Sequence, residues 1–173
     1  MNVILIGYRG CGKTTLGRTL AEQIWKTFVD VDDRIRARFD DRTITQIWTE
    51  DGERAYRDTE VDVTRELCLA DDQVIGLGGG TLMEPGAREA VEQADAVRIY
   101  LKCDPKELFR RIERDGASAA TRPSLTGLGG GLDEILLVLG KRETVYEAVA
   151  DRIFDVTHVQ PDDAVRYLIK NCL

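Results

Sequence analysis

The chain begins with an apolar run that leads directly into a glycine-rich loop, MNVILIGYRGCGKTTLG. Residues 7–14 satisfy the pattern G-x-x-x-x-G-K-[ST] without mismatch, between a strand-like run at 3–6 and a helix-like segment. Glycines let backbone N–H groups converge on phosphate oxygens, and the following helix points its positive N-terminal end at the same place. This context predicts a nucleotide-phosphate site directly after a buried strand.

Two side chains of the loop have predicted roles at the phosphates. Lys13 is expected to reach the β- and γ-phosphates, and the Thr14 hydroxyl to ligate Mg²⁺. A glycine-rich turn with an incidental lysine is the alternative, but the flanking strand and helix argue against it. The chain lacks the guanine-reading pattern NKxD of Ras-type GTPases, so ATP is the favoured nucleotide.

Strand-like and helix-like segments alternate along the rest of the chain. Strands are expected at 3–6, 28–32, 74–77, 96–101 and 152–155. Helices are expected at 14–24, 35–39, 43–48, 53–69, 85–93, 105–114, 132–150 and 162–170. This alternation implies a three-layer α/β/α fold with a parallel sheet covered on both faces.

Length and composition exclude several classes. A chain of 173 residues favours a single domain over 1–173, and no apolar run approaches the ~20 residues of a membrane span. A net charge of −7 argues against broad binding to nucleic acid or membrane surfaces. Four separated cysteines, one histidine and no signal-peptide pattern favour a reduced cytoplasmic chain without structural zinc. A monomer is expected, since no exposed apolar stripe is evident.

A pair of carboxylates follows the second predicted strand. The segment FVDVD places Asp30 and Asp32 two residues apart, which on a strand puts both on one side. The carboxyl edge of a doubly wound sheet is where ligands bind. One carboxylate is suited to organising Mg²⁺ through water, the other to accepting a hydrogen bond from a substrate hydroxyl. A solvated strand end is the alternative, and Asp33 is expected to cap the next helix.

Other candidates are ambiguous when taken alone. Arg57 and Glu60 share a helix face, which is typical of a surface ion pair. The triple glycine at 78–80 lets a ligand or backbone approach closely, or simply forms a turn. Arg122 lies in a glycine-rich segment at about 115–131 that is predicted to be a mobile loop, and Arg142 lies on the next helix. Either arginine is compatible with an ordinary surface position.

Taken in order, these pieces resemble the shikimate kinase family over essentially the whole chain. The matching segments are GYRGCGKTTLG, FVDVD, DGERAYRDTE, GLGGG, TRPSLTG and KRETVY. The resemblance implies transfer of the γ-phosphoryl of ATP to the 3-hydroxyl of shikimate, in the route to chorismate and aromatic amino acids. It also implies a P-loop kinase fold with strand order 2-3-1-4-5, a substrate-binding region at about 32–62 and a lid at about 115–131.

The resemblance assigns a shikimate site with Glu60 in support of Arg57. The implied substrate-binding residues are Asp32, Arg57, Gly79, Gly80 and Arg142. Asp32 would lie nearest the attacking oxygen, and the two arginines would hold the carboxylate of the substrate.

The resemblance also assigns the ATP and metal sites. The implied ATP-binding residues are Gly10, Cys11, Gly12, Lys13, Thr14, Thr15, Arg111 and Arg122. Arg111 would stack on adenine opposite the segment near Pro161, and Arg122 would contact the transferring phosphate. Mg²⁺ would be held by Thr14 and, through water, by Asp30. Lys13, Asp32 and Arg122 are thus the implied catalytic residues.

The chain departs from the family pattern at three places. Val145 replaces a usual leucine, Leu77 replaces a usual threonine or serine, and 127–131 carries more glycine than usual. Another small-molecule kinase of the same fold, for gluconate or a nucleotide, is the alternative enzyme. A nucleotide-binding switch or scaffold is the alternative outside catalysis, and the intact set of candidate catalytic residues argues against it.

Overall fold

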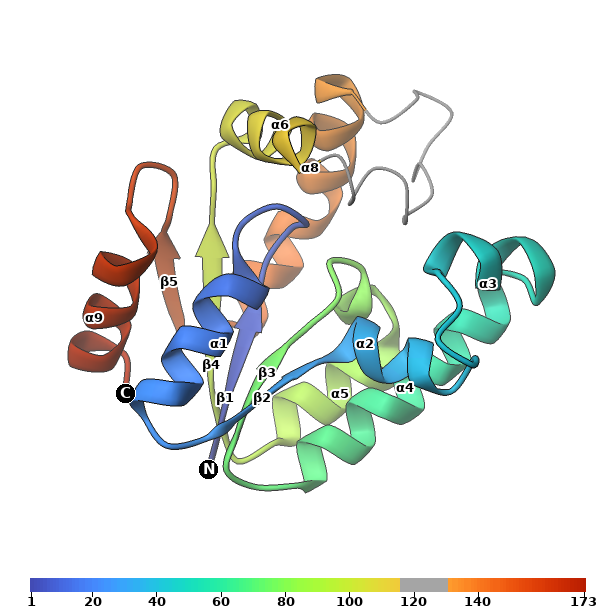
Figure 1. Cartoon of the computed structure of the whole chain (residues 1–173), viewed down its shortest axis with the longest axis horizontal. Helices are drawn as coiled ribbons and strands as arrows, with labels where there is room; N and C mark the ends of the chain where they lie inside the picture. The colour runs from blue at the N-terminus through green and yellow to red at the C-terminus, as the bar shows by residue number, and fades with distance from the viewer. Residues whose placement is uncertain (116–130) are drawn as a thin grey trace.

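The computed structural model describes residues 1–115 and 131–173. A parallel sheet of five strands, in the order β2-β3-β1-β4-β5, runs through its centre (Figure 1). The strands are β1 (Asn2–Ile6), β2 (Thr27–Asp30), β3 (Gln73–Gly76), β4 (Ala96–Lys102) and β5 (Arg152–Asp155). The predicted fold class and strand order are confirmed.

Helices cover both faces of the sheet. They are α1 (Lys13–Gln23), α2 (Val31–Ala37), α3 (Ile44–Glu50), α4 (Glu53–Leu69), α5 (Pro85–Gln93), α6 (Pro105–Arg114), α8 (Leu132–Val149) and α9 (Pro161–Asn171). Helices α1 and α9 pack together on one face, whereas α4 and α5 pack together on the other (Figure 1). None of the helices in the described part of the chain has the length and apolar character needed to cross a membrane.

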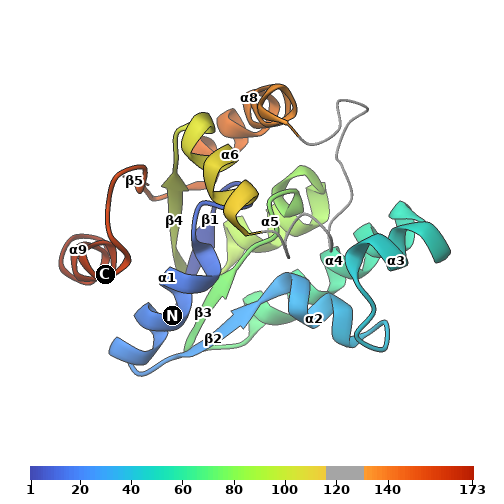
Figure 2. The same cartoon turned by 45° about the horizontal axis from the view of Figure 1, so that its top comes forward.

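The central strand positions the phosphate loop. β1 pairs with β3 on one side and β4 on the other, and the side chains at 3–6 are at most 1% exposed. Burial on both faces explains why this strand is a continuous apolar run rather than an alternating one. Because Gly7 follows β1 directly, the loop emerges at the middle of the carboxyl edge of the sheet. Figure 2 shows α6 and α8 on one side of this edge and α2 and α3 on the other.

The strand predicted at 28–32 is shorter than expected, and the prediction is wrong after Asp30. Asp30 is extended and caps α2, with its Oδ1 accepting a hydrogen bond from the backbone N–H of Asp32 at 3.0 Å. Asp32 therefore lies in the first turn of a helix, and the period-two argument does not describe it. Asp33, predicted as the cap, also lies in this turn. An aspartate cap followed by acidic residues favours a helix start over continuation of the strand.

The segment after the triple glycine contains an element that periodicity did not predict. A short 3₁₀ helix, η1 (Thr81–Met83), follows Gly80 directly. The side chain of Thr81 is fully buried there. This turn places the Thr81 hydroxyl next to α4, where it donates a hydrogen bond to Glu60.

A glycine sets the distance between α1 and the sheet. A Cβ atom on Gly17 would lie 2.3 Å from Cε2 of Phe28 and 3.2 Å from Cδ1 of Leu5. Both neighbours belong to strands, so α1 lies close to β1 and β2 only because this position has no side chain. The position of the helix that begins at the phosphate loop thus depends on Gly17.

We expect Gly17→Ala to lower the free energy of unfolding by about 1–3 kcal/mol, because the added methyl group must displace the Phe28 ring. The helix propensity of alanine offsets only part of this loss. Gly140→Ala in α8 is the matched control, since no atom lies within 4 Å of its added Cβ. That variant is expected to gain about 0.5–1 kcal/mol. Urea unfolding of both proteins measures the difference, and equal stabilisation would contradict the packing argument.

Candidate active site

Two adjoining hollows lie at the carboxyl edge of the sheet. The larger, a cavity of about 690 Å³, is lined by the phosphate loop, α6 and residues 156–161 after β5. The smaller is lined by residues of α3, α4, the triple glycine and α8. The residues shared by both linings are Arg9, Asp32, Gly78 and Gly79. A group passing between the two hollows would therefore pass these four residues.

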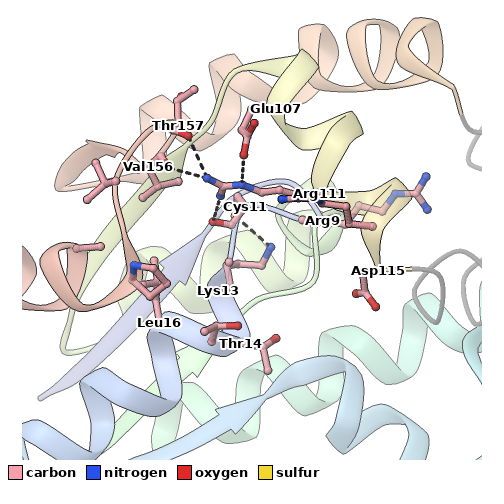
Figure 3. Close-up of a pocket in the computed structure, with 18 of the residues that line it drawn as sticks. Arg9, Cys11, Lys13, Thr14, Leu16, Glu107, Arg111, Asp115, Val156 and Thr157 are labelled. Carbon is pink, nitrogen blue, oxygen red and sulfur yellow. Dashed lines mark hydrogen bonds and ion pairs between the residues drawn. The ribbon is translucent and has the colours of Figure 1, made fainter.

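The phosphate loop has the backbone that its glycines predict. Gly10 and Gly12 have φ angles of 83° and 101°, in the left-handed region where other residues are strained. Lys13 Nζ donates hydrogen bonds to the carbonyls of Gly7 at 2.7 Å and Tyr8 at 3.0 Å. The ammonium group therefore lies inside the curve of the loop, in the larger cavity. Figure 3 shows Lys13 and Thr14 side by side at the start of α1.

Thr14 and Asp30 form a compact oxygen pair. The Thr14 hydroxyl donates to Oδ2 of Asp30 at 3.0 Å. Burial and then the nearby charge of Asp32 raise the pKa of Asp30. Within residues 1–115 and 131–173, no three His, Cys, Asp or Glu side chains gather as a metal cage. One carboxylate and one hydroxyl nevertheless fit Mg²⁺, which usually binds proteins through few oxygen ligands and takes others from water and phosphate.

Arg111 lies in the larger cavity and is held there by backbone oxygens. Its Nη2 donates to the carbonyls of Val156 at 2.9 Å and Thr157 at 3.1 Å, and its Nε donates to Glu107 at 2.8 Å (Figure 3). Hydrogen bonds from Arg110 and Arg111 lower the pKa of Glu107 to about 2, so this carboxylate stays ionised. Pro161 lines the same cavity, which places both residues of the predicted adenine site around one space.

Arg57 and Glu60 form a buried pair rather than the surface pair that their spacing suggests. Arg57 Nη1 donates to Oε2 of Glu60 at 2.7 Å, and these side chains are 13% and 1% exposed. Thr81, in η1, donates its hydroxyl to the other oxygen of Glu60 at 2.6 Å. Burial raises the pKa of Glu60, while the charge of Arg57 opposes the shift. Glu60 thus orients Arg57 toward the smaller pocket.

Arg57 and Arg142 converge at the triple glycine. A Cβ atom on Gly80 would lie 2.9 Å from Nη1 of Arg57 and 3.4 Å from Nη2 of Arg142. Arg142 also donates to the carbonyl of Gly79 at 3.0 Å. The absence of a side chain at Gly80 leaves room for two guanidinium groups, from α4 and α8, to approach this backbone. The result is a small pocket with concentrated positive charge, next to Asp32.

Two aromatic side chains of this pocket were missed by the sequence analysis. Trp48 of α3 and Tyr56 of α4 meet edge to face, with ring centroids 5.9 Å apart. The guanidinium of Arg57 lies 5.5 Å from the Trp48 centroid and 5.3 Å from that of Tyr56. Only the position of Tyr56, directly before Arg57, offered a signal. No sequence rule predicts that α3 folds back onto α4.

Arg9 was also missed, although it lies inside the phosphate-loop motif. Its Nη2 is 3.4 Å from Oε1 of Glu134, which is fully buried in the first turn of α8. The pair joins the phosphate loop to the start of α8. The sequence signal that could have identified Arg9 was its charge at a variable position of the motif.

The structure brings most predicted site residues together. The larger cavity is lined by Gly10, Cys11, Gly12, Lys13, Thr14, Thr15, Asp30, Asp32 and Arg111. The smaller is lined by Asp32, Arg57, Glu60, Gly79, Gly80 and Arg142. Arg122 and most of the predicted lid fall outside the described residues. Of the two apolar departures, Leu77 is buried beside the larger cavity and Val145 packs against the core.

A phosphate loop at the centre of a 2-3-1-4-5 parallel sheet, with a separate arginine-rich pocket beside it, defines a P-loop kinase that acts on a small anionic acceptor. The sequence model described as shikimate kinase matches residues 9–173. The chain therefore belongs to the shikimate kinase family.

Individual relatives agree with this assignment. A shikimate kinase of Rhodopirellula baltica is 33% identical over 169 residues, which cover 98% of this chain and 89% of that protein. One of Alkaliphilus oremlandii is 31% identical, with 98% of each chain covered. Among solved structures, the shikimate kinase of Acinetobacter baumannii in complex with shikimate superimposes with a TM-score of 0.88 at 28% identity. That match covers 98% of this chain and 90% of the other.

We expect Asp30→Asn to raise the free energy of unfolding at neutral pH in EDTA. The amide oxygen can still cap α2 and the amide N–H can donate to the Thr14 oxygen, while the charge beside Asp32 is removed. Because the folded protein raises the pKa of Asp30, the native state binds its proton more tightly, and the advantage of the variant shrinks as pH falls. Thermal unfolding across pH measures this trend.

Asp33→Asn is the control for this experiment, since the Asp33 side chain is 59% exposed in the same helical turn. Asp33→Asn removes the favourable interaction between the Asp33 charge and the N-terminus of α2, so no gain in stability is expected. A loss of stability in Asp30→Asn at every pH would contradict the argument.

Proposed function

We propose that this chain transfers the γ-phosphoryl group of ATP to the 3-hydroxyl of shikimate, giving shikimate 3-phosphate and ADP for aromatic amino acid synthesis. The convergence of Arg57 and Arg142 at Gly80, beside a carboxylate that also lines the nucleotide cavity, carries the proposal. Guanidinium groups bind carboxylates through paired, charge-assisted hydrogen bonds. Shikimate is a small hydroxylated acid, and the bound shikimate of the Acinetobacter baumannii relative supports the same substrate here.

The donor side of the reaction belongs to the phosphate loop. Backbone N–H groups and the N-terminus of α1 favour the phosphate charges, and Lys13 lies where its ammonium group faces the same space. Arg111 would lie against the adenine, held by the loop after β5. Arg122 is proposed as a further cation at the transferring phosphoryl group. These groups position ATP and neutralise charge, which is most of what phosphoryl transfer requires of a protein.

Mg²⁺ is the proposed cofactor, held by the Thr14 hydroxyl and, through water, by Asp30. When bound, the ion neutralises the negative charge that gathers on the β- and γ-phosphate oxygens.

The acceptor side belongs to Asp32 and the two arginines. Arg57 and Arg142 would hold the substrate carboxylate, and Asp32 would accept a hydrogen bond from the 3-hydroxyl. As the oxygen of that hydroxyl bonds to the γ-phosphorus, the bond from phosphorus to the β–γ bridging oxygen breaks and ADP leaves. The hydroxyl proton passes to the carboxylate of Asp32. Positioning of donor and acceptor in line contributes most to the rate.

The reaction is tested by a coupled assay of ADP release with purified protein. ADP release is expected to depend on shikimate and Mg²⁺, with gluconate and nucleoside monophosphates near the ATP blank. Specific activity is expected to stay constant on dilution, since we propose a monomer. The four free thiols fit our proposal of a cytoplasmic location. No stimulation by shikimate would overturn the proposed function.

We expect Arg57→Ala to raise the shikimate KM by ten- to a hundredfold, roughly the 1.5–3 kcal/mol of a hydrogen bond to a charged group. The ATP KM is expected to change little, because Arg57 lines only the smaller pocket. Arg54→Ala is the matched control on the same helix, where a side chain 79% exposed pairs with Asp58. Initial-rate kinetics with each substrate varied measures both constants, and an unchanged shikimate KM would remove Arg57 from the substrate site.

A further inference from the structure

A buried hydrogen bond joins Tyr56 of α4 to Asp32 of α2. The phenolic hydroxyl donates to Oδ1 of Asp32 at 3.0 Å. The two residues are only 4% and 8% exposed, so the bond lies in a largely dry environment. A hydrogen bond to a charged acceptor in such surroundings is among the stronger kinds in proteins. The carboxylate of Asp32, which belongs to α2, is thereby held from α4.

The ring of Tyr56 is itself fixed on two sides. Trp48 packs edge to face with this ring, and the guanidinium group of Arg57 lies 5.3 Å from the ring centroid. The tyrosine thus touches Arg57 with its ring and Asp32 with its hydroxyl. Tyr56 therefore links Arg57, which suits a substrate carboxylate, to Asp32, which suits a substrate hydroxyl.

Neighbouring carboxylates repel the carboxylate of Asp32, so a hydrogen-bond donor is needed to hold its orientation. A Cβ atom on Gly78 would lie 3.0 Å both from Oδ1 of Asp32 and from Oε1 of Glu60. Two carboxylates therefore flank the same short stretch of backbone, and Asp30 lies two residues from Asp32. Like charges this close repel each other in a buried site.

Tyr56 remains a donor in this setting. Burial, followed by the charges of Asp32 and Glu60, holds its pKa well above the usual range of tyrosine. The phenol therefore keeps its proton, so Tyr56 donates the hydrogen bond and Asp32 accepts it.

We propose that Tyr56 is a positioning residue for phosphoryl transfer, which holds the Asp32 carboxylate in register with Arg57 so that the substrate hydroxyl and the substrate carboxylate are aligned together. This inference rests on the proposed function, and it adds to that function a residue which does not itself react. Its contribution comes from orientation: a small rotation of the Asp32 carboxylate moves the acceptor of the hydroxyl proton away from the line of transfer. Phenylalanine at this position would keep the ring contacts and lose only the orientation.

A double-mutant cycle in kcat separates positioning from simple packing. Tyr56→Phe is expected to lower kcat about tenfold, the loss of one hydrogen bond to a charged group. Asp32→Asn is expected to lower kcat much further with little change in ATP affinity. In the double variant, Tyr56→Phe should have an effect of less than about twofold, because the carboxylate that it orients is absent. The shikimate KM should stay within about threefold in Tyr56→Phe, since both arginines remain.

Tyr167→Phe is the control for loss of a tyrosine hydroxyl, because Tyr167 of α9 stacks on Phe154 of β5, outside both hollows. Its kcat should match wild type, and thermal unfolding should show all variants folded at the assay temperature. An unchanged kcat in Tyr56→Phe, or an equal loss with and without Asp32, would overturn the inference while leaving the proposed function intact. Near-normal turnover in Asp32→Asn would instead overturn the role of Asp32 and the inference together.

Discussion

The carboxylate of Asp30 joins the two halves of the site. One of its oxygens caps α2 and so fixes the first turn, in which Asp32 lies. The other accepts from Thr14 at the start of α1, directly after the phosphate loop. One half-buried carboxylate at the end of β2 thus contacts the first turns of both helices. The acceptor residue and the phosphate loop are placed relative to each other through these two hydrogen bonds.

This arrangement gathers charge of both signs in a small space. Asp32 lies near both Asp30 and Glu60, and burial and like charge raise the pKa of Asp30. Arg57 and Arg142 supply compensating charge, but each is held by its own partner, so the pocket between them stays shaped for a ligand. Buried ionic groups contribute little net stability. Their presence at this edge of the sheet is better explained by the chemistry of an anionic substrate and a transferring phosphoryl group.

Several predicted site residues line the two hollows, although the local arguments for placing them there were only partly right. The segment FVDVD was expected to align two carboxylates on a strand, whereas the strand ends at Asp30 and Asp32 lies in a helix. Both still reach the same cavity, because the aspartate cap turns the chain at the carboxyl edge. The spacing of Arg57 and Glu60 predicted their pairing, but their burial depends on tertiary contacts, among them the hydrogen bond from Thr81 to Glu60. Tyr56, Trp48 and Arg9 entered the site through contacts between distant segments, which no local pattern reports.

The sequence by itself determined the phosphate loop, the alternation of strands and helices, and the family to which the chain belongs. Those features depend on local spacing and on glycine conformations, which are written within a few neighbouring residues. The tertiary structure alone decided how close Asp32 lies to Arg57 and Arg142, how α3 covers α4, and that Tyr56 reaches across to hold a carboxylate 24 positions earlier in the chain. Such contacts depend on how helices pack over the sheet, and packing is set by many distant residues at once.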